Sequence, residues 1–275
     1  MRRLHTLTML LIVLGFVPMI ARAAPGPVAM PAGTRAMVNY PILAPGQTTY
    51  VVQPNEATLI IDTLYIPQGV TLVAGPGVTS ILWNVNTLKF DANATINLSA
   101  SQTPPPKAPD GGPPPGQADY CTAGSPGSRG SNGALGANAA NLVLQNIAAV
   151  DNGGGQGSLW IRTDGGPGGN GGNGGQGQQG GGQHRWGSFP PHFCHAAMGG
   201  GGGSGGAAGA GGHLSNVNLF FTLNPAPNFV TGVAAVCGPS QRPPAVQGAS
   251  GQIVIWGGPG CAGSPGPAGP NGGGG

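Results

Sequence analysis

Between residues 49 and 99 the chain alternates apolar and polar residues in short segments that Pro or Gly interrupts. The apolar positions are mostly β-branched or large, which is typical of strands with one buried face. The pattern predicts strands within a β body over residues 48–103, at 49–53, 57–66, 70–74, 80–83 and 87–99.

Part of this region repeats at a spacing of 24 residues. The segment 62–72, Asp-Thr-Leu-Tyr-Ile and then Val-Thr-Leu, returns at 86–96 as Asn-Thr-Leu-Lys-Phe and then Ala-Thr-Ile. One coil of a parallel β-solenoid gives such a repeat, because equivalent inward residues stack and bury a continuous core. An antiparallel sandwich also gives strands at this spacing, although it needs no in-phase repeat. We expect an all-β fold with a parallel β-solenoid-like body.

Beyond residue 120, glycine recurs at every third position in four tracts, and only Ala208 breaks the period. In the second tract the next position is mostly glycine too. Short apolar segments lie between tracts, at 141–150, 158–163, 214–223, 229–237 and 252–256. The glycines in phase are Gly124, Gly127, Gly130, Gly133 and Gly136 in the first tract; Gly165, Gly168, Gly171, Gly174, Gly177 and Gly180 in the second; Gly199, Gly202, Gly205 and Gly211 in the third; and Gly257, Gly260, Gly263, Gly266, Gly269, Gly272 and Gly275 in the fourth.

Glycine at this spacing is suited to close packing of polyproline II chains, which have three residues per turn. Every third residue points the same way, so glycine there lets a neighbouring chain approach until backbone groups bond directly. One tract alone loses too much entropy on ordering and would be a flexible linker. Four tracts of similar length favour an intramolecular polyglycine II helical bundle; disordered linkers and a collagen-like trimer stay open as alternatives.

The first 23 residues have the layout of a secretory signal peptide. Arg2 and Arg3 precede an apolar run at 9–20, and the small-residue site Ala21-Arg22-Ala23 follows. This run is shorter than the roughly 20 residues that span a bilayer. We expect export to the extracellular space, the cell surface or the periplasm, and no transmembrane segment after cleavage.

The remaining chain divides by composition. Residues 24–47 are Pro- and Ala-rich and are expected to form an extended lead-in. Residues 104–120 are expected to be a proline-rich linker between the body and residues 121–275, where strands are interleaved with the four tracts. An exported chain with an even number of cysteines is expected to form disulfides, with three pairings possible among Cys121, Cys194, Cys237 and Cys261.

Charge and motifs exclude several functions. Cleavage removes three of ten basic residues and leaves seven against seven acidic ones, so the mature chain has no basic surface for nucleic acid. The acidic residues are dispersed and no nucleophile-elbow or phosphate-binding motif is present, so we expect no enzyme. No spacing of His and Cys matches a standard metal site, and we expect neither a metal nor another cofactor.

Several features resemble known proteins. The Gly-Gly-Asn and Gly-Gly-Gln triplets of the second tract look like the glycine-rich repeats of mycobacterial surface proteins. Four tracts with cysteines are similar to the polyglycine II bundles of snow flea antifreeze protein and of phage tail-fibre adhesin tips. The 24-residue repeat resembles secreted bacterial parallel β-helix proteins. The likeness to phage adhesins implies that loops at the tip of the bundle choose a receptor.

The segment between the second and third tracts is the richest in functional side chains. It contains aromatic rings and cationic side chains. A loop between two rods would place them at the end of a bundle, where a glycan or a protein surface can stack on them. The same rings could simply cap the bundle. We expect a secreted structural or adhesive protein, with self-association possible; an ice-binding protein and a polysaccharide-active enzyme on a β-helix are the alternatives. The candidate recognition residues are His184, Arg185, Trp186, Phe189, His192, Phe193 and His195.

Overall fold

The structure is a computed structural model that describes residues 28–153, 157–187, 191–222, 229–233 and 252–274. The expected signal peptide lies outside these residues, as do Phe189 and Cys237. Within the described part of the chain, no helix has the length and apolar character needed to cross a membrane.

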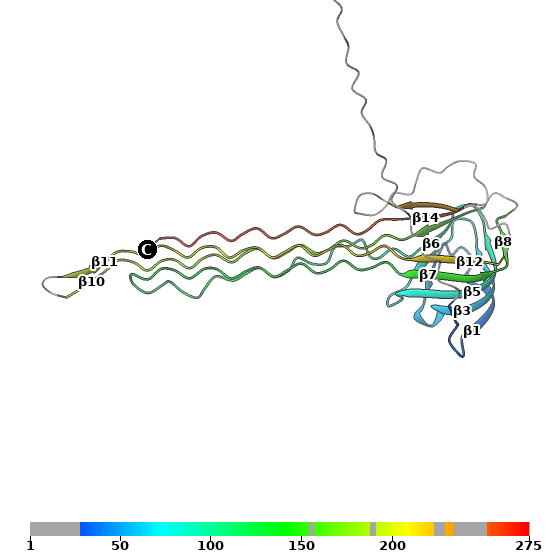
Figure 1. Cartoon of the computed structure of the whole chain (residues 1–275), viewed down its shortest axis with the longest axis horizontal. Helices are drawn as coiled ribbons and strands as arrows, with labels where there is room; N and C mark the ends of the chain where they lie inside the picture. Colours follow the sequence, from blue (N-terminus) through cyan, green and yellow to red (C-terminus); the bar gives the residue numbers. More distant parts are fainter. Residues whose placement is uncertain (1–27, 154–156, 188–190, 223–228, 234–251, 275) are drawn as a thin grey trace, which may run out of the picture.

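Two sheets form the body of the molecule, and every strand pairing within them is parallel. The chain passes from one sheet to the other, so its strands are added in sequence order along most of each sheet (Figure 1). The first sheet has the order β1 (Arg35–Tyr40), β3 (Thr58–Ile66), β5 (Ser80–Phe90), β7 (Asn141–Ile147) and β12 (Val217–Phe221), and β8 (Ala149–Asp151) also pairs with β5. The second sheet has the order β2 (Thr49–Val52), β4 (Thr71–Ala74), β6 (Ala94–Asn97), β9 (Ser158–Arg162), β14 (Gln252–Gly257) and β13 (Phe229–Val233).

The 24-residue repeat of the sequence is the register of this pairing. Leu64 lies beside Leu88 and Ile66 beside Phe90 in the first sheet, and Leu72 lies beside Ile96 in the second. These pairs match the predicted equivalences, and the parallel direction rules out the antiparallel alternative for these strands.

Inward residues of both sheets form one apolar core. Trp83, Tyr40 and Phe90 are its largest fully buried side chains. The Trp83 ring packs edge-on against Tyr40 at 5.1 Å, and its indole N–H donates to the backbone oxygen of Glu56, in the short 3-10 helix Pro54–Glu56, at 2.8 Å. Alternation of apolar residues thus places one face of each strand in the core.

The expected lead-in contains a strand that the sequence analysis missed. β1 lies within residues 24–47 and pairs with β3, with Met37 beside Ile61 and Tyr40 beside Leu64. The segment has few β-branched residues, so pairing with β3 and burial of Tyr40 decide its conformation instead of local propensity.

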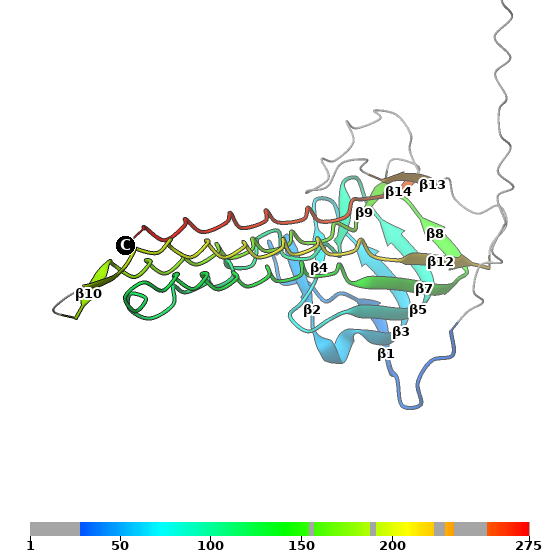
Figure 2. The same ribbon diagram turned by 60° about the vertical axis from the view of Figure 1, so that its left-hand side comes forward.

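Beyond the body, extended segments run side by side as a rod (Figures 1 and 2). The rod is defined as residues 99–138, 164–183, 195–213 and 257–274; the first range lies along the second tract twice, as 99–120 and as 121–138, so backbone hydrogen bonds join five segments. The chain leaves the body after β6, β9 and β14, all in the second sheet, and returns at β7 and β12 in the first. A short antiparallel hairpin at the far end joins β10 (His184–Trp186) to β11 (His192–Cys194).

Residues 104–120 do not form the linker that we expected. They run along the second tract as the fifth segment of the rod. The backbone N–H of Ala108 donates to the oxygen of Asn170 at 3.0 Å, and that of Gly111 donates to Asn173 at 2.7 Å. Proline is compatible with this role, because its fixed φ suits an extended segment that needs few donors.

Candidate functional site

The second tract lies among four neighbours and bonds to all of them. Gly169 donates its N–H to Ala134 of the first tract at 2.8 Å and accepts from Gly209 of the third at 2.9 Å. Gly168 donates to Cys261 beside the fourth-tract glycines at 2.7 Å. These contacts recur at every third residue along the rod, and residues 104–120 supply the fourth neighbour. The rod is therefore held by backbone hydrogen bonds between segments that have no regular strand pairing.

Most in-phase glycines are needed for this approach. A Cβ built at such a position would overlap a carbonyl of the adjacent segment, and backbone cannot move aside as a flexible side chain can. This holds for the glycines singled out from the sequence, which are Gly124, Gly127, Gly130, Gly165, Gly168, Gly171, Gly174, Gly202, Gly205, Gly260, Gly263 and Gly266.

Ala208 does not interrupt the contact between the second and third tracts. The glycines identified from the sequence as in phase, such as Gly205 and Gly211, face the fourth tract. The adjacent phase is glycine throughout, and its N–H groups donate to the second tract at 2.7–2.9 Å. Its members are buried and are Gly200, Gly203, Gly206, Gly209 and Gly212. The third tract thus has two glycine columns, and only the outer one contains an alanine.

Asparagine side chains accept hydrogen bonds from backbone donors along the rim of the rod. The Asn132 amide oxygen accepts from the N–H of Ala207 at 3.0 Å, and the Asn138 oxygen accepts from His213 at 2.9 Å. Asn170 does the same for Ser264 at 2.8 Å. Each side chain replaces the carbonyl that a further neighbouring segment would have provided, and it covers an edge that could otherwise pair with another chain.

The hairpin at the far end of the rod carries a ladder of rings on one face. Tyr120 stacks on His184 with centroids 4.6 Å apart, His184 on Trp186 at 5.9 Å, and Trp186 on His192 at 6.0 Å. His184 and Trp186 alternate along β10, and His192 is the partner of Trp186 in β11, so these three side chains point to the same side of the hairpin.

The opposite face of the hairpin carries a cation over a ring. The guanidinium of Arg185 lies 5.3 Å from the centroid of Phe193, its partner across the strands. We call Tyr120, Met198 and the described hairpin residues the tip; four of its side chains are apolar and exposed, namely Tyr120 at 66%, Trp186 at 49%, Phe193 at 52% and Met198 at 82%.

A disulfide between Cys121 and Cys194 joins the start of the first tract to β11 and fixes the hairpin to the rod. Cys261 is also disulfide-bonded. Both observations agree with the expected use of the cysteines, although Cys237 falls outside the described residues.

The structure brings most of the predicted recognition residues together. His184, Arg185, Trp186, His192 and Phe193 lie in the hairpin, and exposed His195 follows it directly. Phe189 lies outside the described residues. Sequence reasoning missed Tyr120 and Met198. The position of Tyr120 next to Cys121 was an available signal, since the disulfide draws the two segments together.

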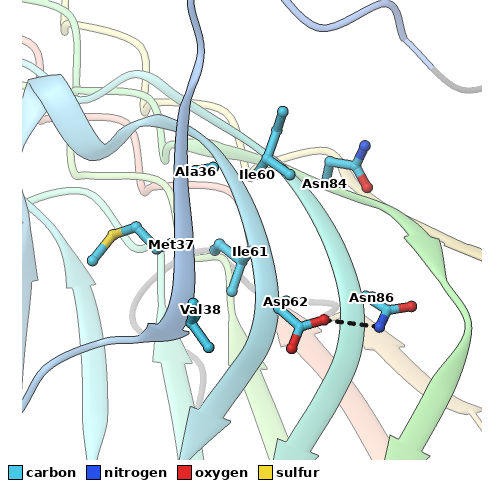
Figure 3. Close-up of a pocket in the computed structure, with 8 residues that line it drawn as sticks. All are labelled: Ala36, Met37, Val38, Ile60, Ile61, Asp62, Asn84 and Asn86. Carbon is cyan, nitrogen blue, oxygen red and sulfur yellow. Dashed lines mark hydrogen bonds between the residues drawn. The ribbon is translucent and has the colours of Figure 1, made fainter.

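A second candidate site is a groove of about 320 Å³ on the outer face of β1, β3 and β5 (Figure 3). Val38 and Ile60 give it an apolar rim. Its one acidic lining residue is Asp62, which accepts a hydrogen bond from the Asn86 amide at 3.0 Å. The lining therefore lacks the pair of carboxylates that glycoside hydrolysis needs.

Elsewhere in the body, Glu56 accepts hydrogen bonds from two tyrosines. Its carboxylate accepts from the hydroxyl of Tyr50 at 2.7 Å and from that of Tyr40 at 3.4 Å. Burial, followed by the negative charge of Glu56, raises the pKa of Tyr40 far above its ordinary value. The Tyr40 phenol therefore stays neutral and acts as a hydrogen-bond donor to Glu56.

Exposed ion pairs involve some of the other charges. Lys107 contacts Asp110 at 2.6 Å on the rod, and Lys89 contacts Asp151 at 2.8 Å on the body. The hydrogen bond from Lys107 lowers the pKa of Asp110. Among the described residues no group of three or more His, Cys, Asp or Glu side chains could hold a metal ion.

Comparison of the chain with models of protein families, with curated proteins and with solved structures finds no match to any of them.

Proposed function

We propose that this chain is a secreted adhesive protein whose body is a parallel β-solenoid and whose rod is a polyglycine II bundle that presents the tip to a surface partner. The solenoid interpretation is supported by the 24-residue register and by the alternation of the chain between two parallel sheets. The bundle interpretation is supported by backbone bonds at every third residue between extended segments.

The observation that carries the adhesive role is the placement of exposed apolar side chains. Along the rod between body and tip, Leu135 is the one large apolar residue that is strongly exposed in the described chain. Four such residues gather at the tip. Exposing such a cluster to water is unfavourable, and exposed apolar patches of this kind mark binding sites.

A glycan is the partner that this chemistry favours. The exposed rings of Tyr120, Trp186 and Phe193 suit the apolar face of a sugar, and Arg185, His192 and His195 can donate hydrogen bonds around it. The disulfides and the expected signal peptide support export, where surface glycans are available.

The test is binding of the purified mature chain to intact, deglycosylated and protease-treated cells. Trp186→Ala with Phe193→Ala should lower binding by at least about tenfold, since each ring contributes roughly a kcal/mol or more. Leu135→Ala, on the rod, is the matched control and should bind normally. Binding that resists deglycosylation but not proteolysis would point to a protein receptor. Equal binding by the tip variant and the native chain would disprove the adhesive role of the tip.

A further inference from the structure

Exposed apolar residues also gather at the opposite end of the molecule. Besides the four at the tip and Leu135, every strongly exposed large apolar side chain of the described chain lies between residues 28 and 60. Val38 and Ile42 are the most exposed of these, at 72% and 73%, and the others are Val28, Val51 and Ile60. β1 carries Val38 and β2 carries Val51, while Val28, Ile42 and Ile60 lie in the adjoining segments and in β3.

Both β1 and β2 are edge strands. β1 ends the first sheet and β2 ends the second, so each has one hydrogen-bonded neighbour in the described structure. The chain just before β1 leaves this edge open, since the N–H of Val28 donates to the side chain of Gln145 in β7 at 2.8 Å. An open edge of this kind is a template for another strand.

The usual features that block an edge are missing here. β1 and β2 contain neither proline nor lysine, and Arg35 is their one charged residue. Along the rod, by contrast, prolines and asparagine caps protect the outer segments. Because edges along the rod are blocked, the open edge at β1 and β2 indicates a site for pairing with another strand.

We propose that the edge at β1 and β2 is a dimer interface, in which β1 pairs antiparallel with β1 of a second copy of this chain. The register that centres the pair between Met37 and Val38 sets Arg35 of one copy level with Tyr40 of the other. Arg35 is the one charged residue of β1, so in this register it meets Tyr40 and no like charges face each other across the two-fold axis.

A head-to-tail stack, with β1 added to β12 of another copy, fits less well. Arg35 occupies the row formed by Leu59, Trp83, Leu144 and Leu219. Stacking on β12 would set Arg35 against Leu219 and bury its charge without a partner, which is costly. The two-fold dimer avoids this burial.

The experiment is light scattering coupled to size exclusion on the mature chain over a wide concentration range. We expect twice the chain mass at high concentration. Val38→Asp places two charges at the centre of the interface and should give a monomer. Leu135→Asp replaces an equally exposed residue on the rod, 75% against 72%, and should stay dimeric.

Circular dichroism of each variant checks that the fold is retained, as expected for substitutions at exposed positions. Three results would overturn the proposal: a native chain that is monomeric throughout, a Val38→Asp variant with unchanged mass, or masses that grow beyond two copies as an open stack requires.

Discussion

Contacts between backbones, at the scale of single residues, explain which glycines the rod requires. At Gly171 a Cβ would overlap the carbonyl oxygen of Gly206 and lie 2.7 Å from that of Ala207. Gly201, in the third tract, is also a glycine, but nothing lies within 4 Å of a Cβ built there. Glycine content alone does not distinguish the two positions.

Gly171→Ala should therefore destabilise the protein by about 1–3 kcal/mol, in the range of overpacked interiors. Gly201→Ala should be neutral or slightly stabilising, because alanine lowers the entropy of the unfolded chain. Denaturant unfolding of both variants measures the difference. Equal stability of the two would show that the tracts are not packed as described.

The asparagine caps predict a stabilising change at Leu135. The side chains of Asn132 and Asn138 each bond to the N–H found 75 residues later, and by this offset Leu135 faces the N–H of Ala210. The structure describes no acceptor for that N–H. Leu135→Asn should supply one and add up to about 1 kcal/mol.

The control for this variant is Leu135→Ser, which removes the same exposed apolar side chain but is too short to reach the neighbouring segment. Thermal unfolding should rank Leu135→Asn above Leu135→Ser. The cap interpretation fails if the two variants unfold at the same temperature.

Ala208 marks the limit of sequence reasoning at this scale. The period of three is visible in the sequence, and most predicted in-phase glycines do contact another segment. Which of two adjacent glycine columns faces which neighbour depends on how the segments are arranged around the second tract. No local pattern carries that information.

Between elements, the register of the sheets continues into the rod. β7 and β12 pair at an offset of 75 residues, which is also the offset of the Asn132 and Asn138 caps. β9 and β14 pair at 94, the offset of Asn170 and Ser264. The body thus fixes how the glycine segments align, which reduces the entropy cost of ordering them.

Asp164 joins the two parts, and its loss should be costly. The buried carboxylate accepts from the Arg162 guanidinium at 3.0 Å and from the N–H of Gly258 at 3.1 Å, and Ser99 lies beside it at 3.4 Å. Asp164→Ala removes the buried acceptor of these hydrogen bonds and should destabilise the protein by about 1–3 kcal/mol.

Asp164→Asn keeps an acceptor oxygen in the same place and should cost clearly less. Urea unfolding of both variants, followed by far-ultraviolet circular dichroism, measures the difference. An Asp164→Ala variant as stable as the native chain would mean that this junction does not hold the rod to the body.

Elements with a strong apolar period were predictable and those without one were not. The strands of residues 49–99 and their 24-residue register followed from alternation and repetition. β1 and the rod segment at 104–120 did not, because contacts distant in sequence determine their conformation. The composition of residues 184–195 marked them as a candidate recognition segment, but the division of this segment into two faces needed the pairing of β10 with β11.

At the scale of the whole molecule, the exposed apolar side chains of the described chain lie mainly in two places, the tip and residues 28–60. The rod has small and polar surfaces and an exposed ion pair between Lys107 and Asp110. This distribution suits a particle that associates at one end and binds at the other, with the glycine segments as a spacer between them.

The most direct test of this account is hydrogen exchange, followed by mass spectrometry, of the second tract in the mature chain. Two N–H groups of each triplet donate to the first and fourth tracts, so these groups should exchange as slowly as those of β3 and β5 and open only with the whole fold. Exchange at the rate of an unstructured peptide, with the body still protected, would contradict the packed rod and leave the tracts as linkers.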